Sequence, residues 1–180
     1  MTLETRQYES ELEVRSDGDG RTICGICVPY DVETRIHAGL TEVFRFGAFD
    51  AVTRAAHRVK LLQGHNTQTM PLGKAITLRE DARGLYGEFK VSKTAQGDQA
   101  LELVRDGVLT NLSVGFQPLK DRKTVTGIVE RIKAHLAEVS LVTFGAYGDA
   151  ASINAIRQIV DKPNLAQLEN LLKKYTKNSV

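Results

Sequence analysis

Short runs of alternating or continuous apolar residues recur along most of the chain and predict β-strands. Charged and apolar residues alternate at 8–14, as in a half-buried strand, and a turn rich in Gly and Asp precedes the apolar run at 22–28. We expect 79–84 to form a hairpin connection. The predicted strands are residues 8–14, 22–28, 59–62, 75–78, 85–91, 108–116, 125–134 and 138–143.

Three segments have the apolar spacing of a helix instead. The first is 46–57, and the second runs from a capping Thr94 to a terminating Gly107. The third begins at Pro163 and carries a stripe of leucines with lysines near its end. Many short strands with few helices predict a mainly β (α+β) barrel domain at 1–155, followed by an amphipathic helix or tail at 156–180.

Composition narrows the classes of function. Apolar residues form 42 % of the 180 residues, enough for a buried core, and 24 basic against 22 acidic residues leave a net charge of +2. Because no clustered basic face is indicated, we expect no nucleic-acid partner. We also expect no membrane span, since no run approaches the roughly 20 apolar residues that a helix needs to cross a bilayer. The charged segment 1–15 lacks the pattern of a signal peptide, which favours a cytosolic protein.

The two cysteines, Cys24 and Cys27, form a C-G-I-C pair inside the predicted strand 22–28. A redox pair would need a βαβ context, and a zinc site would need two further ligands that the spacing does not supply. We therefore interpret them as buried, inert thiols and expect no metal and no cofactor. A metal or redox protein that uses this pair is the alternative.

Two polar residues stand in apolar strand contexts where they could carry chemistry. His65 follows the apolar run at 59–62 and the flexible Gly64, a place from which an imidazole can reach a substrate. Ser113 lies within the apolar strand 108–116, and its hydroxyl becomes a nucleophile only if a base accepts the proton. Alternatively, His65 is a hydrogen-bonded turn residue, and the Ser113 hydroxyl bonds only to neighbouring backbone.

A carboxylate in the next strand offers a partner for such a base. Glu138 shares one strand face with Ser140 and Val142, and a buried carboxylate needs a hydrogen-bond donor such as an imidazole N–H. An exposed glutamate at a strand edge is the alternative. His135, three residues earlier, is expected on the opposite face of a regular strand, so only one of the two could serve the same site.

Five motifs, in this order, resemble the prohead proteases of tailed phages, a family similar to the herpesvirus assemblins. The resemblance covers roughly residues 8–152 and implies an assemblin-like, closed or nearly closed β-barrel surrounded by helices. Two departures from the family pattern are Asn66 after the histidine and Gly145 before Ala146. The motifs are F-R-F-G-A-F (44–49), L-L-Q-G-H-N with P-L-G-K (61–66 and 71–74), G-L-Y-G (84–87), L-S-V-G-F (112–116) and E-V-S-L-V (138–142).

The resemblance implies a serine endopeptidase with Ser113 as nucleophile and His65 as base. It implies an acid as the third residue, for which we choose Glu138. His135 is the second choice, because the assemblins use a second histidine. Backbone N–H groups at Gly145 and Ala146 are the expected oxyanion donors.

The implied substrates are the scaffolding region of the capsid protein precursor and the protease itself, inside the assembling procapsid in the host cytoplasm. Activation by local concentration or by homodimerisation would keep such an enzyme weak until it is enclosed. The main alternative is a non-catalytic scaffold or structural capsid-assembly protein on the same fold. The possession of both His65 and Ser113 argues against it, because a scaffold does not need that pair.

Overall fold

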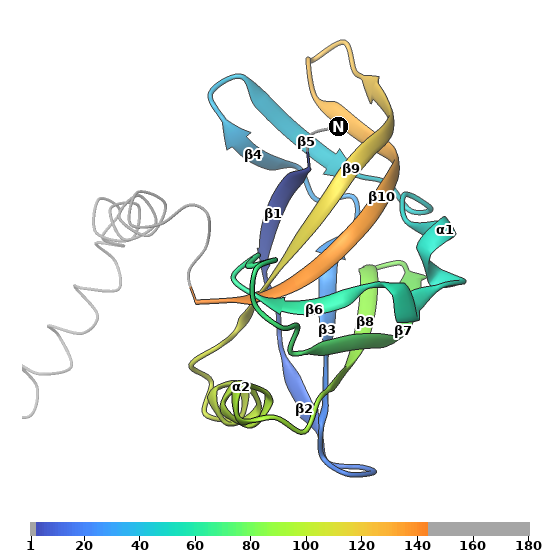
Figure 1. Cartoon of the computed structure of the whole chain (residues 1–180). Helices are drawn as coiled ribbons and strands as arrows, with labels where there is room; N and C mark the ends of the chain where they lie inside the picture. The colour runs from blue at the N-terminus through green and yellow to red at the C-terminus, as the bar shows by residue number, and fades with distance from the viewer. Residues whose placement is uncertain (1–2, 144–180) are drawn as a thin grey trace, which may run out of the picture. The chain divides into compact units, whose positions relative to one another are not determined.

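The computed structural model describes residues 3–143, which contain a ten-stranded, mostly antiparallel sheet (Figure 1). Neighbouring strands follow the order β1-β9-β10-β6-β7-β8-β3-β2, and β5 pairs with both β10 and β4. The strands are β1 (Glu4–Glu9), β2 (Glu13–Arg15), β3 (Thr22–Pro29), β4 (Thr34–His37), β5 (Leu40–Phe44), β6 (Lys60–Gln63), β7 (Gly73–Asp81), β8 (Gly84–Val91), β9 (Asn111–Lys123) and β10 (Val129–Val142).

The sheet curls into a half-barrel, with the long pair β9 and β10 running diagonally through it (Figure 1). Within the described residues no ladder joins the two end strands, β1 and β2. Helices are few: α1 (Asp50–Thr53), the short 3₁₀-helix η1 (Ala56–Arg58) and α2 (Ala95–Arg105). The mainly β fold is thus confirmed, while a closed barrel surrounded by helices stays a prediction.

The core lies on one face of the curled sheet. On β9, Leu112, Val114 and Phe116 are fully buried, and Phe116 packs edge-on against Phe44 with ring centroids 5.1 Å apart. Alternation along the strand directs Ser113 to the opposite face. The strand pattern therefore separates a dry core from the face that carries the candidate chemistry.

Helix α2 forms as its sequence predicts. The Thr94 hydroxyl accepts a hydrogen bond from the Gly97 N–H at 3.1 Å, and Gly107 adopts the left-handed conformation (φ 69°) just after the helix. Leu101 and Val104 anchor its inner side in the core. The predicted C-terminal helix at 156–180 and the domain boundary at 155 lie outside the described residues.

Several predicted elements are wrong in their extent, and four of them are also divided or joined differently in the structure. Residues 8–14 form two strands, because the chain leaves β1 at Ser10, whose hydroxyl donates to the Ile26 carbonyl at 2.9 Å. Residues 125–134 and 138–143 form one strand, β10, which continues through a bulge. The helix at 46–57 is reduced to α1 and η1, and the β4–β5 hairpin was not predicted.

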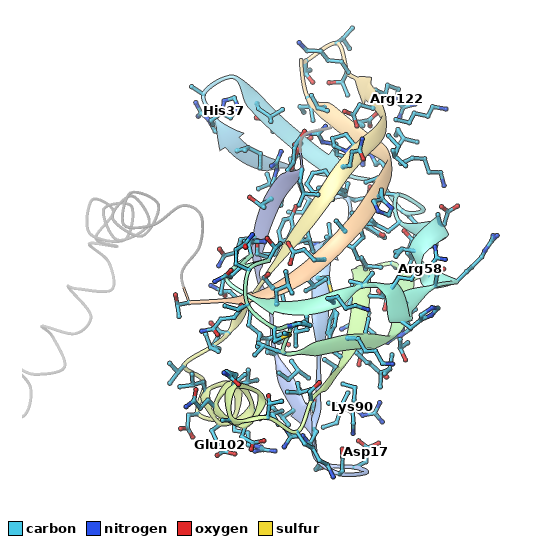
Figure 2. The ribbon with its side chains drawn as sticks, viewed as in Figure 1. Asp17, His37, Arg58, Lys90, Glu102 and Arg122 are labelled. Atoms are coloured by element: carbon cyan, nitrogen blue, oxygen red, sulfur yellow. The ribbon has the colours of Figure 1, made fainter. Side chains whose placement is uncertain are left out.

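Charged side chains lie at the surface in several regions of the fold, and Figure 2 labels examples. The labelled charged residues are Asp17 in the β2–β3 turn, Lys90 on β8, Glu102 on α2, Arg58 in η1 and Arg122 on β9, and the figure also labels His37 at the end of β4. Many are paired with opposite charges, as Lys90 is with Asp19. No helix in the described part of the chain is long and apolar enough to cross a membrane.

Candidate active site

His65 is held at the end of β6 by an unusual backbone. Gly64 and His65 are both left-handed, with φ of 57° and 60°, and for a non-glycine residue this conformation is uncommon and costs about 1–3 kcal/mol. The Gly64 N–H donates to the Leu141 carbonyl at 2.9 Å, and the His65 N–H donates to Ser140 Oγ at 3.0 Å. Strand β10 thereby fixes the turn that presents the imidazole.

Ser113 lies on β9, which runs between the end strand β1 and β10. Its ladder partners are Gln7 on β1 and Ser140 on β10, and its side chain is on the face opposite the core. The residue is only 2 % exposed. Its hydroxyl lies 3.1 Å from the Arg6 carbonyl, to which it can donate.

The three predicted residues meet in one hydrogen-bonded relay. Ser113 Oγ lies 2.6 Å from His65 Nε2, and His65 Nδ1 lies 2.6 Å from Glu138 Oε1. A carboxylate only accepts hydrogen bonds, so Nδ1 carries the ring proton and Nε2 is free to accept from the serine. A nucleophile, a base and an orienting acid in this order can activate a hydroxyl for acyl transfer.

A β-bulge on β10 directs Glu138 into this site. Leu136 pairs with Phe116 and Glu138 with Gly115, so Ala137 is an extra residue in the strand. Leu136 and Val139 can therefore both enter the core, and Glu138 turns to the face that Ser113 occupies. In a regular strand Glu138 would share the core face with Leu136.

The same bulge corrects the prediction that His135 and Glu138 face opposite sides. His135 pairs with Gln117, and Glu138 pairs with Gly115, so both lie on the same face of the sheet. His135 is nevertheless exposed and lines a separate cavity of about 350 Å³ with Arg58 and Ala137. His65 Nδ1 is occupied by Glu138 instead.

Room for the carboxylate comes from Gly115. A Cβ atom at this position would lie 2.3 Å from Glu138 Oε1, far inside van der Waals contact. The glycine of the L-S-V-G-F motif is therefore required by its cross-strand partner, Glu138, rather than by a turn. The sequence identified the motif without identifying this role.

Ser140 is a functional candidate that the sequence analysis did not single out. It is fully buried, and its hydroxyl donates to Glu138 Oε2 at 2.7 Å while accepting the His65 N–H. Both carboxylate oxygens of Glu138 are thus satisfied, one by His65 and one by Ser140. The signal was present in the alternation that places Glu138 and Ser140 on one strand face.

Strand β1, which flanks the nucleophile, is anchored by a buried ion network. Arg6 Nε lies 2.5 Å from Glu42 Oε1, and Arg131 Nη2 lies 2.7 Å from Glu42 Oε2. Glu42 is completely buried, so removal of the carboxylate would leave Arg6 with only Glu4 as a partner, and Arg131 with only Glu4 and Asp121. This network holds β1 against β5 and β10 on the core side, opposite the relay.

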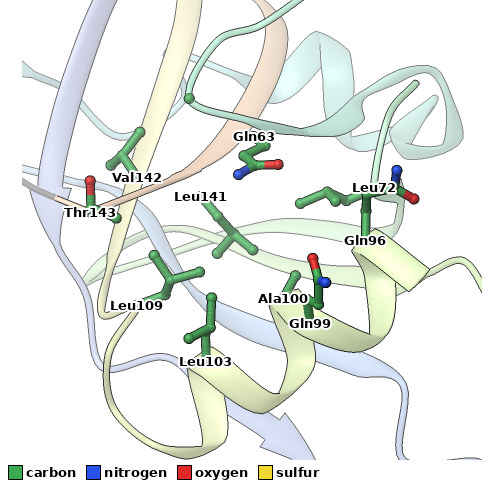
Figure 3. Close-up of a pocket in the computed structure, with 11 residues that line it drawn as sticks. Gln63, Leu72, Gln96, Gln99, Ala100, Leu103, Leu109, Leu141, Val142 and Thr143 are labelled. Atoms are coloured by element: carbon green, nitrogen blue, oxygen red, sulfur yellow. The ribbon is translucent and has the colours of Figure 1, made fainter. Parts of the chain in front are cut away.

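An apolar cavity of about 410 Å³ opens beside the His65 turn (Figure 3). Gly64 and Leu141 form the wall nearest to the relay, and Ala100 and Leu103 of α2 form the opposite wall. Its position next to the histidine turn, and a lining that is apolar apart from Gln63, Gln96, Gln99 and Thr143, suit a side chain with an apolar body.

The cysteines are buried and free, on β3, which carries none of the relay residues. Burial raises the pKa of both thiols, most strongly that of Cys27, so the neutral thiol is favoured. Within residues 3–143 no cluster of three or more His, Cys, Asp or Glu side chains could hold a metal ion. The predicted oxyanion donors, Gly145 and Ala146, lie outside the described residues.

Known proteins resemble this chain in sequence and in fold. A family model described as Caudovirus prohead serine protease matches residues 10–163. The Prohead protease of Enterobacteria phage HK97 is 29 % identical over 167 residues, which are 91 % of this chain and 73 % of that protein. The structure of the bacteriophage T4 capsid assembly protease, gp21, matches with a TM-score of 0.56 at 11 % identity, over 78 % of this chain and 96 % of that one. The structural match supports the fold, while the predicted likeness to the herpesvirus assemblins stays a prediction.

Proposed function

The chain belongs to the caudovirus prohead serine protease family, and on this premise we propose that Ser113, His65 and Glu138 form the catalytic triad of its peptidase activity. The observation that carries the proposal is the relay of two 2.6 Å contacts, from Ser113 Oγ to His65 Nε2 and from His65 Nδ1 to Glu138 Oε1. A structural protein on this fold would have no need of that alignment.

In the proposed reaction His65 Nε2 takes the hydroxyl proton of Ser113 as Oγ attacks the scissile carbonyl carbon. The tetrahedral intermediate collapses, the C–N bond breaks, and His65 returns the proton to the leaving amine. Water, deprotonated by the same imidazole, then hydrolyses the acyl-enzyme and restores Ser113. Glu138 keeps the Nδ1 proton in place and offsets the positive charge that His65 gains in each step.

The proposed substrates are the precursor of the capsid protein, cut in its scaffolding region, and other copies of the protease itself. The proposed place of action is the interior of the assembling procapsid in the host cytoplasm. An apolar side chain next to the scissile bond would occupy the cavity between Gly64 and Leu103. Activation by homodimerisation or by local concentration remains part of this proposal.

The test combines the purified protein with the capsid precursor of its own phage and sequences the new termini. Ser113→Ala should abolish cleavage with a loss of about 10⁴–10⁶ in kcat, while its circular dichroism spectrum stays that of the wild type. A fluorophosphonate should label the wild type at Ser113 and leave the variant unlabelled. Full cleavage by a folded Ser113→Ala variant would remove the serine from the mechanism, and no cleavage by the wild type would favour the scaffold alternative.

A further inference from the structure

The side-chain amide of Gln7 stands out among the buried polar groups of the molecule. Its Nε2 is the one buried side-chain nitrogen or oxygen atom within residues 3–143 that has no hydrogen-bond partner. Native folds satisfy nearly all such groups, and leaving one unpaired destabilises the folded state. A donor held without a partner in the resting enzyme is therefore available to a group that arrives later.

The register of the sheet places this donor beside the nucleophile. Gln7 is the direct ladder partner of Ser113 across β1 and β9, and Ser113 is in turn the direct partner of Ser140 across β9 and β10. Directly opposite residues of antiparallel strands project to the same face, with Cβ atoms about 4.5–5.5 Å apart. The three side chains therefore form one row on the face opposite the core.

The base reaches Ser113 from one end of this row. His65 follows β6, which pairs with β10, and its backbone N–H is bound by Ser140 Oγ while its Nε2 contacts Ser113 Oγ. Gln7 is at the other end of the row. Ser113 therefore lies between the imidazole and the unpaired amide.

That arrangement meets the geometric need of a tetrahedral intermediate. When Oγ attacks a carbonyl, the carbonyl oxygen gains negative charge and needs donors in a position that the base does not occupy. The guanidinium of Arg6, the nearest cation on β1, is engaged by Glu42 on the core side of the sheet, so it is not directed at this face. The neutral amide of Gln7 is the donor that β1 offers here.

We propose that Gln7 is a catalytic residue whose Nε2–H donates a hydrogen bond to the oxyanion formed at Ser113. The proposal rests on the proposed peptidase function. Ser113 is 2 % exposed, and the Gln7 amide nitrogen is buried as well. Because the two residues are ladder partners, a carbonyl that reaches the Ser113 hydroxyl also comes close to the Gln7 side chain, whose Nε2 then gains a hydrogen-bond partner.

The test compares three variants with the wild type, with the capsid precursor of the same phage as substrate. Gln7→Met keeps the side-chain length and removes the donor, Gln7→Glu keeps the shape and places an acceptor there, and Thr5→Val is a control on the same face of β1, opposite Gly115. We expect kcat to fall about 10²–10³-fold in Gln7→Met and further in Gln7→Glu, with KM little changed. Thr5→Val should retain wild-type kinetics.

Thermal unfolding distinguishes a catalytic role of Gln7 from a structural one, because only a structural role would lower the melting temperature together with kcat. Because Gln7→Met removes an unpaired buried amide, its melting temperature should equal or exceed that of the wild type while its kcat falls. A kcat within about twofold of wild type, or a kcat that falls together with the melting temperature, would overturn the role of Gln7 alone. A wild-type protein that neither cleaves the precursor nor reacts with a fluorophosphonate at Ser113 would overturn the proposed function, and the role of Gln7 with it.

Discussion

The Ser140 hydroxyl donates to Glu138 Oε2 across 2.7 Å, two residues along the same strand. Ser140 Oγ also accepts a hydrogen bond from the backbone N–H of His65 at 3.0 Å. One buried hydroxyl therefore fixes the acid by its side chain and the base by its main chain. The Ser140 hydroxyl is engaged by His65 and Glu138 rather than by its ladder partner Ser113, so we expect it to act as a positioning residue.

Replacement of this hydroxyl should impair turnover more than binding. We expect Ser140→Ala to lower kcat about 10–100-fold with little change in KM, because Glu138 and His65 lose the group that orients both. The unpaired His65 N–H and Glu138 Oε2 should also cost about 1–3 kcal/mol of unfolding free energy. Steady-state kinetics and urea unfolding measure the two effects, and an unchanged kcat in a destabilised variant would reduce Ser140 to a structural residue.

The identity of the third residue can be tested by charge removal. Glu138→Gln preserves shape and removes the carboxylate, so kcat should fall about 10²–10⁴-fold with little change in KM. His135→Ala is the matched control, on the same strand face and without a contact to the His65 ring, and should behave as wild type. A crippled His135→Ala variant would favour a two-histidine arrangement, whereas two active variants would leave a Ser–His dyad.

Gly115 should be intolerant of the smallest substitution. In Gly115→Ala the new methyl group would displace the Glu138 carboxylate, because the Cβ position lies 2.3 Å from Oε1. We expect activity as low as in Glu138→Gln with a stability loss of only about 1–3 kcal/mol. Gly87→Ala is the control, since its Cβ would meet the Phe89 ring at 2.6 Å away from the relay. The Gly87→Ala variant should lose stability and keep its kcat. A Gly115→Ala variant with wild-type kcat would show that the Glu138 carboxylate can move without loss of activity.

The apolar cavity beside the His65 turn should govern substrate affinity. Leu103 lines it and is 39 % exposed, so Leu103→Asp places a charge in the lining at little cost to the fold. We expect KM for the capsid precursor to rise about tenfold with kcat nearly unchanged. Val108→Asp, an exposed residue just beyond α2 that is not part of the lining, is the control. Equal KM values for the two variants would separate this cavity from substrate binding.

The two thiols should be unreactive in the folded protein. Because burial raises the pKa of Cys24 and of Cys27, iodoacetamide at pH 8 should leave both unmodified until urea unfolds the chain. The same shift makes unfolding free energy decline above about pH 9, since only the unfolded chain releases these protons readily. Fast alkylation of the native protein would revive the redox interpretation, and mass spectrometry of the labelled peptides decides it.

The sequence was sufficient to single out Ser113 and His65 as candidates, and the reasons are local. His65 follows a strand end and a glycine, and Ser113 is a polar residue in an apolar strand within a recognisable motif. The cap and the terminating glycine of α2 are equally local, so that helix was predicted correctly. Interactions within a few residues of one another leave such marks in a sequence.

The features that complete the site depend on how the strands pair with one another, which no local sequence pattern reports. The extra residue at Ala137 has no turn or glycine signal, and only the pairing of β10 with β9 reveals it. Gln7 was outside the predicted strand 8–14, and its importance comes from its register against Ser113. The β4–β5 hairpin was missed because its strands are short and one contains Glu42, a buried charge that only Arg6 and Arg131 make tolerable.

The relay joins residues that are remote along the chain, and this has a consequence for when the enzyme can act. His65 is 73 positions from Glu138 and 48 positions from Ser113. Contacts between residues so far apart in sequence form late in folding. Each one closes a long loop, and the loss of chain entropy comes before the stabilisation by the completed sheet. We therefore expect a partly folded chain to be inert, with peptidase activity and near-UV circular dichroism lost at the same urea concentration. Completion of folding would itself be the first safeguard against premature cleavage, ahead of any control by assembly.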